Sequence, residues 1–265
     1  GDLFAMGAEA QSATAVATVP YGLESKVEDV VYQMMAGAVE VLNEAGCALV
    51  GGHTGEGQEL ALGFAANGYI DPDTVMSKGG MKPGDALILT KPVGTGTLFA
   101  AHPRLEAKGR WIDAAIASML LSNRLGARCL HEHGANACTD VTGFGLLGHL
   151  VEMTRPSEVD AELDLGAIPV LPGAEETAAS GILSSLQPAN VRLRRAIRNQ
   201  EEVVDHPRYP LAFDPQTAGG LLASVPADRA DACVNALKAL GYPETAIIGR
   251  VREQGEALEP ILLNP

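Results

Sequence analysis

Residues 138–150 read Cys-Thr-Asp-Val-Thr-Gly-Phe-Gly-Leu-Leu-Gly-His-Leu, the most informative stretch of this chain. One carboxylate, Asp140, stands before three glycines, between an expected strand end at 134–138 and an expected helix start at 146–153. Carboxylate oxygens suit Mg²⁺, and glycine lets backbone N–H groups approach an anion closely. The pattern is compatible with two structures, a capped strand-to-helix turn and one wall of a Mg²⁺-phosphate site.

The composition indicates a globular protein with a core of small aliphatic side chains. The chain has 265 residues, enough for two medium domains or one large one. Hydrophobic residues make up 46% and aromatic residues only 4%, so Ala, Val, Leu and Ile must build the core. The 30 glycines stand in pairs and short clusters, which favours structured turns over disorder.

The charge balance narrows the class of partner. A net charge of −14 and a pI near 4.8 argue against nucleic-acid binding through a broad basic surface. No apolar run reaches the roughly 20 residues of a membrane span, and no secretory signal is visible. We therefore expect a cytoplasmic protein without membrane or nucleic-acid partners. Since the sequence does not begin with Met, we also expect a piece of a longer protein.

The cysteines give no sign of a disulfide framework or a zinc motif. Cys47, Cys129, Cys138 and Cys233 form no C-x-x-C pair. They are expected to be buried, reduced thiols.

The first part of the chain predicts strand, helix, strand and strand. The expected strands cover 12–19, 47–50 and 60–70, and a helix over 28–45 ends at Gly46. The second strand runs into Gly51-Gly52-His53-Thr54-Gly55, expected to be a glycine turn at a strand end. A polar stretch over 71–82 contains Gly79-Gly80, and we place the domain boundary there, with domains at 1–78 and 79–265.

The second part mixes strands and helices without strict alternation. Strands are expected at 85–90, 221–225 and 246–251, and helices at 112–131, 192–198 and 228–240. The proline-containing stretch 155–173 is expected to be rich in loops. This order favours an α+β fold over a doubly wound sheet.

Three further segments allow two interpretations each. The Gly-Gly-His-Thr at 51–54 can be a structural turn or an anion nest of backbone amides. Lys91–Thr97 can be a strand-to-helix connection or a phosphate loop. Asp2, at an expected helix start, has the position of a capping acid. The arginines at 192, 194, 195 and 198 can be a solvated surface or an anion contact. No G-x-S-x-G, H-E-x-x-H or post-strand G-x-G-x-x-G is present, so these residues indicate Mg²⁺-phosphate chemistry but no substrate.

Five segments together resemble the selenophosphate synthetases (selenide, water dikinases). They are Asp2–Ala8, Leu49–Thr54, Lys82–Gly96, Thr139–Leu150 and Asp214–Leu222, in family order and nearly spanning the chain. Thr-Asp-Val-Thr-Gly-Phe-Gly-Leu-Leu-Gly-His-Leu and Asp-Pro-Gln-Thr-Ala-Gly-Gly-Leu-Leu are the specific parts. Aminoimidazole-ribonucleotide synthetase and the thiamine-monophosphate kinases carry looser versions.

The resemblance implies a two-domain aminoimidazole-ribonucleotide-synthetase-like (PurM-like) α+β fold with a truncated N-terminal domain. It implies a homodimer formed through the N-terminal domains, and a transferase that converts ATP, selenide and water to selenophosphate, AMP and phosphate with Mg²⁺. By this resemblance Asp2 and Asp140 match Mg²⁺ ligands. Gly51, Gly52, His53 and Thr54 match a segment that contacts nucleotide phosphates.

The resemblance leaves the catalytic residues of the family unmatched. Its reactive Cys or selenocysteine and its Lys correspond to no position here, and Cys47 in an apolar strand is a poor nucleophile. We therefore assign no catalytic residue and expect the chain alone to be inactive. Two alternatives stay open, another ATP-using enzyme of the same fold and a non-catalytic dimerising module of a larger fusion.

Overall fold

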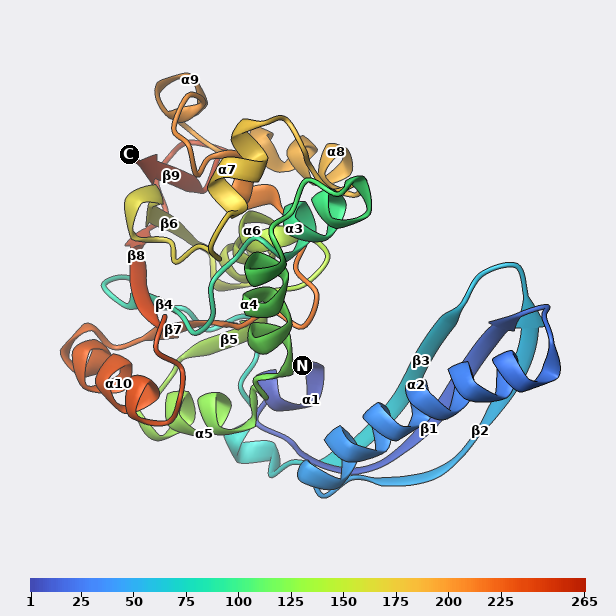
Figure 1. Cartoon of the computed structure of the whole chain (residues 1–265). Helices are drawn as coiled ribbons and strands as arrows, with labels where there is room; N and C mark the ends of the chain where they lie inside the picture. The colour runs from blue at the N-terminus through green and yellow to red at the C-terminus, as the bar shows by residue number, and fades with distance from the viewer. The chain divides into compact units, whose positions relative to one another are not determined.

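The computed structural model describes residues 1–265, which form two compact units. The larger unit comprises Gly1–Met6 with Met76–Pro265, and the smaller unit comprises Gly7–Val75. The structure thus groups the first six residues with the C-terminal part of the chain, whereas the sequence predicts domains at 1–78 and 79–265. Figure 1 labels the elements of both units.

The smaller unit is a three-stranded sheet with one long helix (Figure 1). Its elements are β1 (Glu9–Pro20), α2 (Glu24–Glu44), β2 (Ala48–Gly57), β3 (Ala61–Tyr69) and the 3₁₀ turn η1 (Pro72–Thr74). The strand order is β2-β1-β3, with β1 parallel to β2 and antiparallel to β3. A parallel pair needs a crossover, which α2 supplies. Side chains alternate along β1, so Ala13 and Ala15 are buried while Val16 is 56% exposed.

The prediction of a glycine turn at Gly51–Gly55 is wrong. These residues lie inside β2 and pair in register with Thr14–Thr18 of β1. The glycine at 52 has a packing reason, because a Cβ there would lie 2.2 Å from the Ala15 carbonyl oxygen. The close approach of β1 to β2 therefore explains the glycine at 52. From sequence alone, a short apolar strand followed by glycines does not show whether the glycines form a turn or continue the strand.

A six-stranded sheet forms the larger unit. Its order is β5-β7-β4-β8-β6-β9, antiparallel except for the parallel β6–β9 pair. The strands are β4 (Ala86–Leu89), β5 (Ala137–Asp140), β6 (Val159–Asp164), β7 (Leu221–Val225), β8 (Ala246–Glu253) and β9 (Ile261–Asn264). The sequence predicts the positions of β4, β7 and β8. It misses β6, which lies within the stretch expected to be loops, and it misses β9.

Helices cover both faces of this sheet. The α-helices are α1 (Asp2–Ala5), α3 (Thr95–Ala101), α4 (Gly109–Leu120), α5 (Arg124–Glu132), α6 (Gly145–Ser157), α7 (Ala174–Ala179), α8 (Gln187–Asn190), α9 (Gln200–Val203) and α10 (Ala227–Ala239). The 3₁₀ turns are η2 (His102–Arg104), η3 (Leu165–Ala167), η4 (Val191–Ala196) and η5 (Pro210–Phe213). Along β4, Leu87 and Leu89 enter one apolar cluster with α4 and α6, while Ala86 and Ile88 enter a second with α5 and α10.

The expected single helix over 112–131 is two helices, α4 and α5. Leu121, with φ −64° and ψ 112°, ends α4. The carbonyl of Leu121 accepts a hydrogen bond from the Lys91 ammonium at 2.6 Å, and the Ser122 carbonyl accepts one from the Tyr242 hydroxyl at 2.5 Å. Because side chains distant in sequence donate to these carbonyls in place of helical N–H groups, α4 can end here. The amphipathic sequence pattern runs on through the break into α5, so it does not reveal the interruption. Similarly, the expected helix at 192–198 is the 3₁₀ turn η4 and ends before Ile197.

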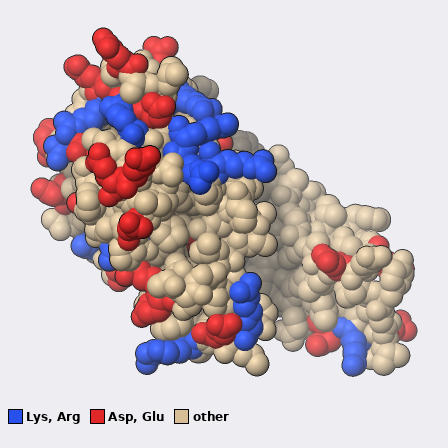
Figure 2. Space-filling model, turned by 90° about the horizontal axis from the view of Figure 1, so that it is seen from above, with Lys and Arg blue, Asp and Glu red and all other residues tan.

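The charged side chains at the surface agree with the net charge of −14. Figure 2 shows Lys and Arg side chains in separate groups with Asp and Glu between them, so the face it draws has no continuous basic surface. Arg198 donates to Asp160 at 2.7 Å. None of the helices combines the length and the apolar character needed to cross a bilayer.

Candidate functional site

Asp140 ends β5 at the edge strand of the larger sheet. Its side chain is only 9% exposed, and its carboxylate has no hydrogen-bonding or ion-pairing partner within the chain. A buried carboxylate without a partner is costly unless a cation or water compensates it. Its hard oxygens are the donors that Mg²⁺ prefers, so this residue fits the cation that the resemblance implies.

The turn after Asp140 is shaped by glycines. Gly145 begins α6 at φ +71°, a conformation that L side chains rarely adopt, and a Cβ there would lie 2.8 Å from the Phe213 carbonyl. Gly143, between them, has nothing within 4 Å of a built Cβ. The turn therefore has open space at Gly143, three residues after Asp140 in the chain.

His149, which lies in α6, holds this turn in place through hydrogen bonds. Its Nε2 accepts the Thr142 N–H at 3.0 Å and lies 3.2 Å from the Thr142 hydroxyl. Burial lowers the pKa of His149, opposed by the nearby carboxylates of Glu152 and Asp140. The neutral ring thus acts as an acceptor that fixes the segment after Asp140. No sequence motif assigns His149 a role, although its position seven residues after Thr142 in an apolar helix can be read from the sequence.

Asp2 is exposed and begins α1, which packs against β5. A Cβ built on Gly1 would lie 2.3 Å from Oδ2 of Asp140, so the chain just before Asp2 runs directly against that carboxylate. The structure therefore brings the start of α1 and Asp140 together within the larger unit. Gly51, Gly52, His53 and Thr54 are exposed on β2 of the smaller unit.

The Lys91–Thr97 segment connects β4 to α3, as the structural interpretation predicts. Its backbone N–H groups already have protein acceptors. Gln216 Oε1 accepts from Gly94 at 2.9 Å and from Thr95 at 3.1 Å, and Asp214 Oδ2 accepts from Gly96 at 3.0 Å. These amides are therefore satisfied by the Asp-Pro-Gln segment.

Asp214 is fully buried at this connection. Burial raises its pKa to about 7 from 3.8, although hydrogen bonds from Gln216 and the backbone of Gly96 and Thr97 oppose the shift. Its second oxygen, Oδ1, is buried without a partner. The carboxyl is thus half protonated near neutral pH.

Lys91, at the start of the Lys91–Thr97 segment, is a second buried ionisable group. Its ammonium donates to the carbonyls of Ser118 at 3.1 Å, Leu121 at 2.6 Å and Ala218 at 2.9 Å. Burial lowers its pKa to about 8. With three backbone acceptors, Lys91 ties β4, the α4–α5 break and the segment before β7 together.

The four cysteines are free and buried, as expected from the sequence. Burial raises the pKa of Cys129, and it raises the pKa of Cys138 and Cys233 to about 12. Because the thiolate is the nucleophilic form, none of these three is an activated nucleophile.

Comparisons with known proteins agree with this architecture. Residues 1–70 match the AIR synthase related protein, N-terminal domain, and residues 82–259 match its C-terminal domain. The selenide, water dikinase of Nitratidesulfovibrio vulgaris (strain Hildenborough) is 35% identical over 274 residues, covering 100% of this chain and 75% of the relative. That of Clostridioides difficile (strain 630) is 34% identical over 264 residues, covering 98% and 74%.

Two solved structures share the fold. Hydrogenase maturation protein HypE superposes with a TM-score of 0.76 at 19% identity, covering 98% of this chain and 74% of that one. Thiamine-monophosphate kinase from Stenotrophomonas maltophilia K279a gives 0.73 at 20% identity, covering 99% and 74%. At these identities the likeness shows the fold alone.

The two matched domains and the mixed sheet define an AIR-synthase-related (PurM-like) α+β protein. Within that class, the chain belongs to the selenide, water dikinase family, a family of phosphotransferases.

Proposed function

We propose that this chain supplies most of an enzyme that converts ATP, selenide and water to selenophosphate, AMP and phosphate. The observation that carries the proposal is the buried, unpartnered Asp140 carboxylate beside an open glycine turn. It stands in a chain whose curated relatives are named selenide, water dikinase. ATP as substrate is supported by HypE, a structural neighbour solved in complex with ATP.

Asp140 is the residue that would hold Mg²⁺ in this account, with Asp2 at the start of α1 as a second ligand. Bound Mg²⁺ neutralises phosphate charge, which is the main requirement of phosphoryl transfer. The protein's own contribution is to position the turn that follows Asp140. His149 fixes Thr142, and the backbone at Gly143 leaves room for an anion to approach the turn.

Gly51, Gly52, His53 and Thr54 would contact the nucleotide phosphates. Because this segment is a strand and not a nest, the contact would come from exposed side chains of β2. His53 pairs with Val16 and Thr54 with Ala17 across the β1–β2 ladder, so their imidazole and hydroxyl stand on opposite faces of the sheet. Only one of the two can face a given phosphate.

The 265 residues alone are expected to form no selenophosphate. The resemblance assigns the family's reactive Cys or selenocysteine and its Lys to no residue here, and the four cysteines are buried. The measurement is ³¹P NMR of ATP and selenide with the purified chain. We expect selenophosphate when this chain replaces the matching 75% of the Nitratidesulfovibrio vulgaris relative.

Two outcomes would contradict this account. Selenophosphate made by the chain alone would refute the expected inactivity. A folded chimera that turns over ATP with thiamine phosphate or an amidine substrate, but never with selenide, would point to another enzyme of the same fold.

We propose further that two copies pair through the smaller unit. Several of its apolar side chains are open to solvent, including Val16 at 56%, Tyr32 at 68%, Val50 at 65% and Tyr69 at 66%. Sedimentation equilibrium should show a dimer that Val16→Glu weakens, because a charge would enter an apolar contact. Leu258→Glu, at a site 95% exposed on the larger unit, is the matched control. A monomer at all concentrations would contradict the pairing.

A further inference from the structure

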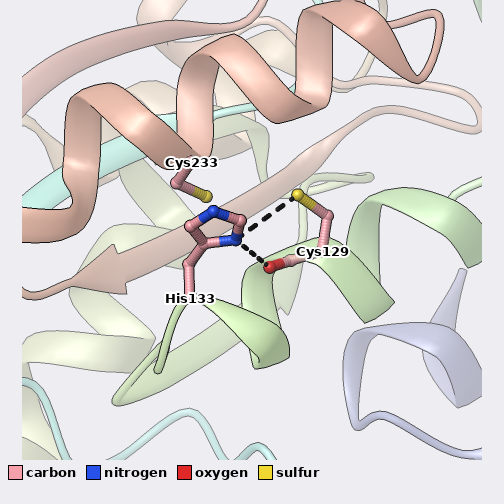
Figure 3. Close-up of side chains that lie close together, drawn as sticks. All are labelled: Cys129, His133 and Cys233. Atoms are coloured by element: carbon pink, nitrogen blue, oxygen red, sulfur yellow. Dashed lines mark hydrogen bonds between the residues drawn. The ribbon is translucent and has the colours of Figure 1, made fainter.

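A cluster of three metal-ligating side chains lies between two helices of the larger unit. Cys129 on α5 and His133 at its C-terminal end face Cys233 on α10 (Figure 3). Each residue offers one ligand atom, and these atoms lie within 4.8 Å of one another. The two helices pack side by side, which Figure 1 also shows. Because Cys233 is distant in sequence, no motif spacing reveals the cluster.

The histidine is oriented as metal-binding histidines are. Its Nδ1 lies 2.8 Å from the carbonyl oxygen of Cys129. A carbonyl can only accept, so Nδ1 carries the proton and donates it, which leaves the lone pair on Nε2. In metal sites the same arrangement, with one ring N–H bound to a backbone carbonyl, fixes the tautomer of the ligating imidazole.

Both sulfurs lie against this ring. Sγ of Cys129 is 3.7 Å from His133 Nδ1, and Figure 3 shows Sγ of Cys233 next to the ring. In a tetrahedral zinc site, bond lengths near 2.3 Å to sulfur and 2.1 Å to nitrogen place ligand atoms about 3.6–3.8 Å apart. The three ligand atoms of the cluster lie within 4.8 Å of one another, so they must move closer together to reach that spacing. Cys129 and Cys233 are 2% and 0% exposed, while His133 is only partly buried and leaves a route from solvent.

We propose that Cys129, His133 and Cys233 bind one Zn²⁺ ion, with a water in the fourth position. Two thiolates and an imidazole form a soft donor set, distinct from the carboxylate oxygens around Asp140. The ion braces α5 against α10 on the face of the sheet that carries the second apolar cluster. It adds a metal of a different chemical class from the Mg²⁺ of the proposed reaction.

The test titrates the reduced, chelator-treated chain with Co²⁺ and then with Zn²⁺. We expect one Co²⁺ with a sulfur-to-metal charge-transfer band and tetrahedral visible bands, both abolished by one equivalent of Zn²⁺. Cys233→Ser and His133→Gln should weaken Zn²⁺ binding by at least about tenfold. Cys47→Ser, at a buried thiol of the smaller unit, should bind as the wild type does. Zn²⁺ should raise the Tm of the wild type and of Cys47→Ser only.

Circular dichroism keeps a misfolded variant from being counted as a lost ligand. If Cys233→Ser does not fold, the wild-type spectrum and the His133→Gln variant still decide, because His133 is only partly buried and a folded His133→Gln should lose Zn²⁺ affinity. Absence of the charge-transfer band in the folded wild type would overturn the proposal. So would a Cys129–Cys233 disulfide found by mass spectrometry in a chain that takes up no metal when reduced, or Zn²⁺ affinity unchanged in a folded Cys233→Ser.

Discussion

Replacing Gly219 with Ala is expected to lower the free energy of unfolding by about 3 kcal/mol or more, the upper range for overpacking a core. The added Cβ would lie 2.1 Å from the Val141 carbonyl oxygen and 2.9 Å from the Gln216 Cβ. The nearest atom belongs to the backbone of Val141, so the clash cannot be relieved by rotating a flexible side chain. Val141 is also held by its N–H, which donates to the Gly220 carbonyl at 2.8 Å. The strain therefore falls on the turn that follows Asp140.

Urea unfolding followed by Trp111 fluorescence measures this effect. Trp111 is the one tryptophan of the chain and is buried in the core of the larger unit, so it reports on the unit that carries the substitution. The matched control is Gly143→Ala in the same region, where a Cβ meets nothing within 4 Å, and it should change the free energy of unfolding by less than about 1 kcal/mol. Equal midpoints for the two variants would contradict the close-approach explanation.

Asp214→Asn is expected to remove a pH dependence of stability. The folded-state pKa of Asp214 is raised to about 7 from 3.8, chiefly by burial. Between these values the folded chain binds more protons than the unfolded chain, so the stabilisation is complete below pH 3.8 and is lost as pH rises to about 7. Asn cannot ionise. The wild type should therefore lose about 2 kcal/mol relative to Asp214→Asn between roughly pH 5.5 and 8.5.

The measurement is a series of urea unfolding curves for the two proteins across this pH range. Comparing the two proteins at each pH cancels the contribution of the many surface carboxylates. Asp113→Asn, at an exposed position of α4, should run parallel to the wild type. A difference between wild type and Asp214→Asn that stays constant with pH would show that Asp214 is ionised throughout.

The sequence predicts best those elements whose pattern is local. The apolar run at Leu221–Val225 is β7 with the same bounds, and the strand end, turn and helix around Asp140 are all present. Each depends on neighbouring residues only. The fold class and the family follow from motifs of this kind, because the glycines at 145 and 219 have steric reasons that leave little choice of residue.

The sequence predicts least where distant residues decide. The end of α4 depends on Lys91 and Tyr242, which supply hydrogen bonds from other elements. The conformation of Gly51–Gly55 depends on pairing with β1, and a glycine pair is equally typical of a turn and of a close strand contact. Burial of Asp214 and its hydrogen bonds to the α3 start are tertiary as well.

The most direct test of Asp140 as a Mg²⁺ ligand is Mn²⁺ binding to the chain, measured by electron paramagnetic resonance with Mg²⁺ as competitor. Mn²⁺ accepts the same oxygen ligands as Mg²⁺. We predict weak binding that Mg²⁺ displaces and that Asp140→Asn weakens by at least about tenfold, while Asp113→Asn leaves it unchanged. Undiminished Mn²⁺ binding by a folded Asp140→Asn protein would contradict the assignment of Asp140 as a ligand of the Mg²⁺-phosphate site.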